Sequence, residues 1–290
     1  MGRPDIHAFF HEPTNTVSYV VVDPETKHAA LIDPVLDFDP ASGKVWRESV
    51  TEVLSAARNL GVEIKWILET HAHADHLSGA QIAHAETGAP VVIGDHIRAV
   101  QQTFAPRFLA EDVTENYEAF DRLVREGDVL PLGALDIRVL HTPGHTPACV
   151  TYVIGDAAFV GDTLFMPDFG TARADFPGGD AKALYRSIRK ILALPAETRI
   201  FVGHDYKAPG RNEYAWETTV AAERKDNVQI NDTIDEASFV AARRARDATL
   251  AAPRLLLPSL QVNIRGGRLP PADKDGVVRF RIPITLADQS

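Results

Sequence analysis

Short apolar runs, rich in β-branched side chains and bounded by turn residues, recur along roughly the first 230 residues of the chain. Runs of this length and composition are typical of buried strands, because β-branched side chains fit the pleated surface of a sheet. They predict strands at 16–23, 29–34, 63–69, 137–141, 149–154, 157–162 and 199–204.

Between these runs the apolar residues recur at helical spacing. Such spacing predicts helices over 45–61, 77–88 and 181–194, and the first two end at Gly61 and Gly88, where a glycine is a common stop signal. The stretch 96–127 is polar and rich in phenylalanine and charge, and we expect a helical insertion there. This mixed succession of strands and helices indicates the α/β class.

The texture of the sequence changes after residue 228. A further helix is predicted over 235–250, and the apolar "LLLPSLQV" follows at 255–262. An apolar segment of this kind would be an aggregation hazard if it were exposed. We therefore expect one catalytic domain over 1–228 and a C-terminal extension, 229–290, docked on it.

Composition and charge exclude several classes of partner. The 290 residues carry a net charge of -10, with a pI near 5.5, which argues against nucleic acid or an anionic membrane. The single cysteine, Cys149, excludes an internal disulfide and fits a reducing compartment. No secretory signal or membrane-spanning run is recognised, so a cytoplasmic protein is expected. The sequence leaves open whether the chain forms a homo-oligomer.

Metal-binding side chains gather where predicted strands end. The stretch "ETHAHADHLSG" (69–79) follows one strand, and further histidines follow others. Because strand ends present side chains without covering them, these groups are expected to converge on one pocket. Imidazole with carboxylate suits zinc or iron, and the absence of thiolate argues against a structural zinc site. The residues concerned are His71, His73, Asp75, His76, His145, Asp162 and His204.

Four motifs together resemble the metallo-β-lactamase fold superfamily over roughly residues 10–228. They are "HAHADH" (71–76), "HTPGHT" (141–146), "GDTL" (161–164) and "GHDY" (203–206). The resemblance implies an αββα sandwich, in which two mixed β-sheets lie face to face and helices flank them. In dinuclear members one metal would take His71, His73 and His145. The other would take Asp75, His76 and His204, with Asp162 bridging the two.

Smaller motifs are similar to the bacterial branch of the glutathione-dependent sulfur dioxygenases, also called persulfide dioxygenases. They are "IDPVLDF" (32–38), "HTPACVTY" (145–152), "GTARADFPGG" (170–179) and "GHDY", although Ala148 replaces a glycine of the more familiar pattern. The resemblance implies one Fe(II) per chain, held by His71, His145 and Asp162, and a reaction of glutathione persulfide with O2 and water that gives sulfite and glutathione. The remaining four residues would orient ligands and water around a vacated second metal position: His73, Asp75, His76 and His204.

Three further residues are expected to bind substrate. Arg173 and Asp175 lie two apart in a glycine-rich segment that begins eight residues past Asp162. We expect Arg173 to position an anionic substrate and Asp175 to fix its loop, the alternative being a surface ion pair of little energetic weight. Tyr206, in "GHDY", completes the expected substrate-binding residues.

Other functions remain to be weighed against this one. All ligands of a zinc-dependent glutathione thioester hydrolase of the glyoxalase II kind are present, and a metal-bound water of lowered pKa could attack a thioester. "GTARADF" favours the dioxygenase. A flavodiiron oxygen reductase is disfavoured because that family carries a glutamate at the position of His73. A non-catalytic binding protein with this fold usually loses ligands, and none is missing here.

Overall fold

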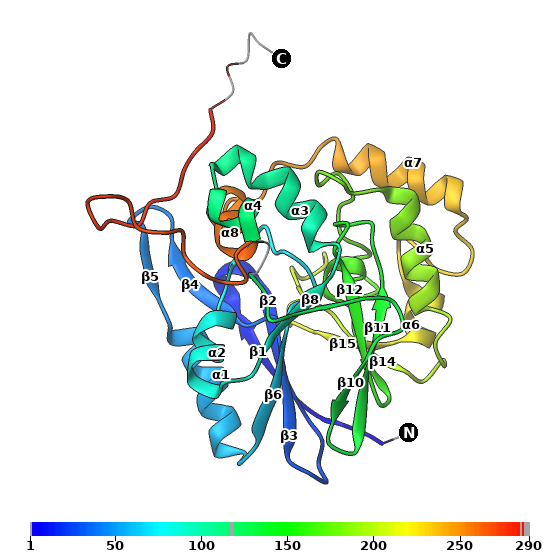
Figure 1. Ribbon diagram of the computed structural model, residues 1–290. Coiled ribbons are helices and arrows are strands. Elements are labelled where there is room, and N and C mark those ends of the chain that lie inside the picture. The colour runs from blue at the N-terminus through cyan, green and yellow to red at the C-terminus, as the bar shows by residue number, and fades with distance from the viewer. Residues whose placement is uncertain (1, 117–118, 285, 287–290) are drawn as a thin grey trace.

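Two six-stranded sheets lie face to face in the computed structural model, which describes residues 2–116, 119–284 and 286 (Figure 1). The first sheet has the order β1-β2-β3-β6-β8-β9 and the second the order β10-β11-β12-β13-β14-β15. In the first sheet β1, β2 and β3 are antiparallel, whereas β3, β6, β8 and β9 run parallel. In the second sheet only the β13–β14 pair is parallel. Both sheets are therefore mixed.

Seven strands of the two large sheets correspond to the apolar runs of the sequence, namely β2, β3, β6, β11, β12, β13 and β14, whereas β1, β8, β9, β10 and β15 were not predicted. The first sheet contains β1 (Asp5–His11), β2 (Thr16–Val22), β3 (His28–Ile32), β6 (Glu63–Leu68), β8 (Val91–Gly94) and β9 (Arg122–Val124). The second contains β10 (Val129–Leu132), β11 (Leu135–His141), β12 (Val150–Ile154), β13 (Ala157–Phe159), β14 (Arg199–Phe201) and β15 (Glu217–Thr219). A small third sheet joins β5 (Lys44–Trp46), β4 (Val35–Asp39) and β7 (Leu77–Ser78).

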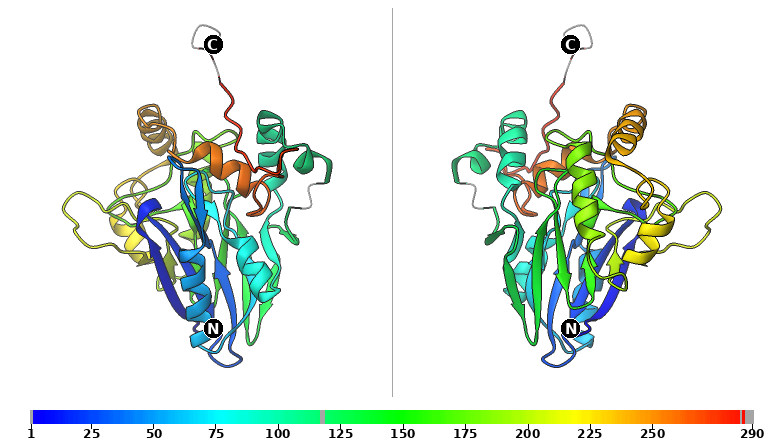
Figure 2. Two further views of the ribbon diagram at one scale, coloured as in Figure 1. Left: turned by 90° about the vertical axis from the view of Figure 1, so that its left-hand side faces the viewer. Right: turned by 90° about the vertical axis from the view of Figure 1, so that its right-hand side faces the viewer.

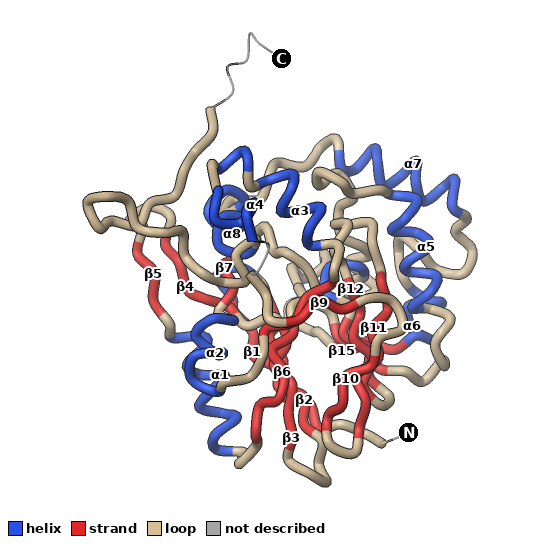
Figure 3. Tube along the Cα trace, in the orientation of Figure 1, coloured by secondary structure: helices blue, strands red, loops and turns tan. Residues whose placement is uncertain are grey.

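Helices cover the outer faces of both sheets, as Figures 1 and 3 show. They are α1 (Glu48–Asn59) and α2 (Ala80–Thr87) beside the first sheet, and α5 (Ala181–Ile191), α6 (Val220–Asp226) and α7 (Glu236–Asp247) beside the second. Both side views place α3 (Ile97–Phe104), α4 (Glu111–Asn116), α7 and α8 (Leu256–Asn263) at one end of the molecule (Figure 2). The predicted αββα sandwich is confirmed.

Strand β2 shows why uninterrupted apolar runs predicted strands correctly. Tyr19 and Val21 belong to the apolar layer between the two sheets. Val20 and Val22 point the other way, into the layer shared with α1 and α2. Because successive side chains of a strand alternate between faces, a strand covered on both faces must be apolar throughout.

Two predicted helices begin later than expected, because short strands precede them. Residues Lys44–Trp46 form β5, where Asp37 pairs with Trp46, and α1 begins only at Glu48. Leu77–Ser78 form β7, which pairs with β4. The residues at these positions pair with β4 in a sheet. The helical spacing of the apolar residues could not separate these short strands from the helices that follow.

The prediction of a purely helical insertion over 96–127 is wrong at its end. Helices α3 and α4 lie there, but Arg122–Val124 form β9, because they pair in parallel with β8 and close the first sheet. Positions 117 and 118 of the predicted insertion lie outside the described residues.

The segment after residue 228 packs on both halves of the sandwich. Phe239 and Val240 of α7 join the apolar cluster of α5 and the second sheet. Leu260 of α8 and the adjacent Ile264 join the cluster that α1 and α2 form with the first sheet. No helix of the described residues is long and apolar enough to span a membrane.

Candidate metal centre

The ends of four strands bring the predicted site residues to one place. β6 leads into the loop 69–76, β11 leads into the loop that carries His145, and β13 leads into a short 3-10 helix, Gly161–Thr163. His204 follows β14 and forms an isolated antiparallel β-bridge with Thr16. The imidazole side chains at these strand ends are buried, with His71 and His204 each 1% exposed. The strand ends thus gather these side chains, although the sequence separates them by up to 133 residues (71 to 204).

Glycines allow two of the loops to approach their neighbours closely. Gly144, beside His145, has φ +139° and would place a Cβ against the backbone of Leu184 in α5. Gly161, beside Asp162, has φ +50° and would place a Cβ on the side chain of Thr70. Only glycine fits such positions without strain, so both ligand-bearing loops are fixed by contact with other elements.

The candidate ligands form two groups with Asp162 between them. In the first group the ligand atoms of His71, His145 and Asp162 lie within 4.8 Å of one another. Asp162 Oδ2 is 3.8 Å from His71 Nε2 and 3.6 Å from His145 Nε2. The other oxygen of Asp162, Oδ1, lies 3.3 Å from His204 Nε2.

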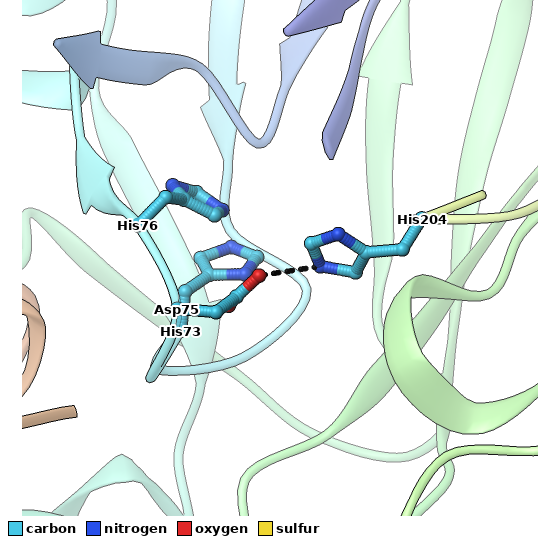
Figure 4. A group of neighbouring side chains, drawn as sticks. All are labelled: His73, Asp75, His76 and His204. Atoms are coloured by element: carbon cyan, nitrogen blue, oxygen red, sulfur yellow. Dashed lines mark ion pairs between the residues drawn. The ribbon is translucent and has the colours of Figure 1, made fainter. Parts of the chain in front are cut away.

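The second group joins the loop 73–76 to β14 (Figure 4). Its members are His73, Asp75, His76 and His204, whose ligand atoms also lie within 4.8 Å of one another. The ion pair drawn in Figure 4 joins His204 Nε2 to Asp75 Oδ2 at 3.2 Å. Through Asp162, the two groups form one continuous centre.

Six polar atoms of this centre are buried without a hydrogen-bond partner among the described residues. Leaving such an atom unpaired costs about 1–3 kcal/mol. A cluster of unpaired lone pairs from imidazole and carboxylate is the donor set of a zinc or iron site. The residues present therefore fit a metal. The atoms are His71 Nε2, His73 Nδ1, Asp75 Oδ2, His76 Nε2, Asp162 Oδ1 and His204 Nε2.

The second nitrogen of three imidazoles is fixed by a backbone carbonyl. Nδ1 of His145 donates to Arg173 O at 2.8 Å, and Nδ1 of His76 donates to Leu77 O at 3.1 Å. Nδ1 of His204 lies 3.2 Å from Asn15 O. Since a carbonyl only accepts, the proton sits on Nδ1 and the lone pair on Nε2 faces the centre.

His73 is held differently, by two buried carboxylates. Its Nε2 lies 3.0 Å from Asp33 Oδ1 and 3.1 Å from Glu69 Oε2. Burial alone would lower the pKa of His73, but the two carboxylates outweigh it and raise that pKa well above its ordinary value. Because a carboxylate only accepts, these contacts hold a proton on Nε2, and Nδ1 is the atom of His73 that faces the centre.

Sequence reasoning missed Asp33 and Glu69. Asp33 follows β3, and Glu69 follows β6, the parallel neighbour of β3 in the first sheet. Both carboxylates lie within stretches that the sequence had singled out, "IDPVLDF" and "ETHAHADHLSG", but their common target depends on which strands pair. The signal that could have found them is the carboxylate at the end of each adjacent strand.

Cys149 takes no part in metal binding. Its buried thiol contacts the hydroxyl and the backbone nitrogen of Thr146. Burial raises the pKa of this thiol to about 12, so it remains protonated near neutral pH. The ligands of the centre are therefore nitrogen and oxygen only.

A cavity of about 250 Å³ opens onto the first ligand group. Asp75, His145 and Asp162 border it on the metal side. Its other walls combine aromatic rings with the predicted Arg173 and with two arginines of α7, which sequence reasoning had not assigned to the site. They include Phe165, Phe169, Tyr206, Arg173, Arg243 and Arg246.

The three predicted substrate-binding residues lie in different positions. Arg173 lines the cavity and forms a bidentate pair with Asp175, at 2.5 and 2.7 Å, and it also donates to Ala251 O. Asp175 itself lies outside the cavity lining and faces Arg173. Tyr206 lines the cavity, and its ring stacks on His204 with centroids 5.7 Å apart. Their roles toward a substrate stay predictions.

Comparison with known proteins assigns this architecture. Residues 11–204 match the model of the metallo-beta-lactamase superfamily. A probable metallo-hydrolase of Burkholderia pseudomallei is 50% identical over 96% of this chain and 98% of its own. The Glyoxylase B2 of Dictyostelium discoideum is 41% identical over 99% of both chains.

Two further proteins are less similar to this chain in sequence. The mitochondrial persulfide dioxygenase ETHE1 of Homo sapiens is 31% identical over 71% of this chain and 70% of its own. The crystal structure of ETHE1 from Myxococcus xanthus superposes with a TM-score of 0.73 at 29% identity, covering 91% of this chain and all of that one.

Proposed function

Because the chain belongs to the metallo-β-lactamase superfamily, we propose that it is an iron-dependent persulfide dioxygenase, which converts glutathione persulfide, O2 and water into sulfite and glutathione. The observation that carries this proposal is the buried group of His71, His145 and Asp162 beside the cavity. Two imidazoles and one carboxylate are the ligands of non-haem iron oxygenases. The 31% identity to a persulfide dioxygenase supports the proposal.

The three residues would hold iron through the side-chain atoms that face one another at the centre. His71 and His145 would bind through Nε2, since Nδ1 of His145 is occupied by Arg173 O and Nδ1 of His71 lies 3.0 Å from Thr70 Oγ1. Asp162 would bind through its carboxylate. When bound, iron would supply the redox-active centre with adjacent open positions that O2 chemistry requires.

The cavity fits an anionic substrate with a sulfur end. Two of its arginines are already neutralised, since Arg173 pairs with Asp175 and Arg243 pairs with Asp247 at 2.7 Å. Arg246 has no side-chain partner within the described part of the chain and is exposed at the cavity. It would receive a carboxylate of glutathione persulfide, while Phe165 and Phe169 exclude water from the reacting sulfur.

A zinc-dependent thioester hydrolase of the glyoxalase II kind is the second candidate. The second ligand group favours it, because His73, Asp75, His76 and His204 keep unpaired atoms where a second metal would bind. The 41% identity to Glyoxylase B2 and the 50% identity to a probable metallo-hydrolase point the same way. A pair of metals would lower the pKa of a bound water for attack on the thioester.

One experiment separates the two functions. Apoprotein is loaded with Fe(II) or with Zn(II), and each form is supplied with glutathione persulfide in an oxygen electrode and with a glutathione thioester in a hydrolysis assay. The proposal predicts oxygen uptake and sulfite release by the iron form alone. Thioester hydrolysis by the zinc form, with no oxygen uptake by either form, would assign the protein to the hydrolases.

A further inference from the structure

Asn263, the last residue of α8, reaches from the C-terminal extension to the loop 69–76 that follows β6. This loop carries four of the candidate metal-binding residues and is called the ligand loop. Its Nδ2 donates to His73 O and to His76 O, both at 2.8 Å. Its Oδ1 accepts from Ser78 N at 2.9 Å. One buried amide, 4% exposed, therefore contacts the backbone on both sides of Asp75.

The loop has little else to fix its backbone. Among the described residues, no backbone-to-backbone hydrogen bond involves positions 71–76. The carbonyls of His73 and His76 are instead satisfied by Asn263, and buried carbonyls need such partners. The amide thereby fixes the stretch that presents Nδ1 of His73, Oδ2 of Asp75 and Nε2 of His76 to the metal centre.

The C-terminal end of α8 is itself held by side chains of three other helices, α2, α3 and α4. Gln81 of α2 donates through Nε2 to Gly266 O at 3.1 Å, and Gln101 of α3 donates through Nε2 to Ile264 O at 3.0 Å. Arg265 pairs with Asp112 of α4 at 2.7 Å. Asn263 is therefore carried by a rigid support, which is what precise placement of a ligand requires.

From these contacts we infer that Asn263 is a positioning residue of the metal centre. It acts through the backbone of His73 and His76 and touches neither substrate nor metal. It lies outside residues 11–204, which match the family model, so this chain braces its ligand loop with a segment beyond the matched region. The inference rests on the proposal that the loop holds metal, and it is independent of whether the reaction is oxidation or hydrolysis.

Gln261 provides a matched control on the same helix. It is 2% exposed and also makes three hydrogen bonds, donating to Leu257 O and Arg281 O and accepting from Arg281 N. None of these bonds reaches the ligand loop. Replacing Gln261 thus removes the same number of hydrogen bonds at the same burial without touching positions 73–78.

The test compares Asn263→Leu, Asn263→Asp and Gln261→Met in the full-length chain. Affinity for Zn(II) and for Co(II) is measured by competition with a chelator, together with the visible spectrum of the Co(II) form. We expect Asn263→Leu to weaken metal binding roughly 10–100-fold and to alter the Co(II) spectrum, as loss of a group that orients ligands does. Gln261→Met is expected to lower the melting temperature and to leave affinity and spectrum as in the wild type.

Asn263→Asp keeps the acceptor for Ser78 N and loses the two donors, so it should weaken metal binding even where Asn263→Leu fails to fold. Wild-type affinity in Asn263→Asp, or an equal loss in Gln261→Met, would overturn the inference. Because Zn(II) and Co(II) affinities do not depend on oxygen uptake, a protein that proves to be a hydrolase would still show the effect.

Discussion

Each imidazole of the centre engages one ring nitrogen in a hydrogen bond and directs the other inward. For His76, His145 and His204 the partner is a backbone carbonyl, whereas for His73 it is a pair of carboxylates. The partner determines which nitrogen carries the proton, and the tautomer determines which atom can bind metal. Residues that look alike in the sequence are therefore unequal in chemistry.

Substituting the histidines one at a time tests this inequality. His71→Ala should lose iron and oxygen consumption together, because it removes a proposed ligand of the single iron. His76→Ala should keep much of its iron and lose roughly 10–100-fold in affinity or activity, the usual cost of removing a group that orients ligands. Iron content by elemental analysis and oxygen uptake are measured on both. Equal loss of iron in the two variants would contradict a single iron at the first group.

The bidentate contact of Arg173 gives a second prediction. Arg173→Lys keeps the charge but cannot form the planar pair with Asp175 and the bond to Ala251 O together. Losing about one charge-assisted hydrogen bond, ~1.5 kcal/mol, should lower kcat/KM about tenfold. Arg189→Lys, whose arginine makes comparable contacts to Asn231 O and Ile234 O away from the cavity, is the control. Wild-type kinetics in Arg173→Lys would show that the ion pair between Arg173 and Asp175 has no role in catalysis.

The candidate ligands were easier to read from the sequence than the residues that hold them in place. His71, His145 and Asp162 stand in short motifs, so their types and spacing were readable along the chain. Asp33 and Glu69 converge on His73 only because β3 and β6 pair in parallel. The carboxylate at each strand end is visible in the sequence, but the histidine that both carboxylates contact is known only once the strand pairing is known.

At the scale of elements, the second sheet is covered by helices that also shape the cavity. Helix α7 supplies Arg243 and Arg246 to the wall, and α6 carries a buried glutamate, Glu223, which is 0% exposed. Oε2 of Glu223 accepts from Asn227 Nδ2 at 2.7 Å, and that amide also donates to Gly170 O near the cavity. A buried carboxyl thus supports a backbone segment next to the cavity.

Glu223 should make stability depend on pH. Burial raises its pKa from 4.5 to about 8, so the folded protein keeps a proton that the unfolded chain releases. Between these values stability is expected to fall as pH rises, by up to ~1.4 kcal/mol per pH unit from this group. Urea unfolding at a series of pH values should show a steeper fall for the wild type than for Glu223→Gln.

The matched control for this titration is Glu52→Gln on the exposed face of α1. It should keep the pH dependence of the wild type. A pH dependence that Glu223→Gln leaves unchanged would show that the carboxyl is already ionised in the folded protein.

Short elements escaped sequence reasoning, and the reason is physical. Strands β5 and β7 have three and two residues, too few to show a period, and each stands directly before a helix. The residues of β5 and β7 were therefore predicted as part of the helices that follow them, α1 and α2. Longer elements such as α5, whose apolar positions repeat over three turns, were predicted within a few residues.

The whole molecule joins the sandwich to its C-terminal extension at three places. Helix α7 packs on α5, α8 packs on the ligand loop and on α2, and Arg246 of α7 stands at the cavity. The extension thereby contacts the core, the metal centre and the cavity beside it. We propose that residues 229–290 belong to the catalytic unit and do not fold as a separate domain.

Truncation tests this proposal. Deleting residues 229–290 would remove Phe239 and Leu260 and expose the apolar surfaces of the sandwich on which they pack. We therefore expect insoluble or inactive protein. Deletion from residue 282 onward is the control, because Ile282 and Ile284 are 69% and 84% exposed and their loss should leave solubility and activity intact. A soluble and fully active 1–228 fragment would refute the proposal.

The central claim is that one iron per chain, at His71, His145 and Asp162, supports oxidation of a persulfide. Anaerobic titration of the apoprotein with Fe(II), followed by oxygen uptake at each point, measures it most directly. Activity is predicted to reach its plateau at one equivalent of iron, with one sulfite released for each O2 consumed. A plateau only at two equivalents, or two bound zinc ions with thioester hydrolysis and no oxygen uptake, would contradict it.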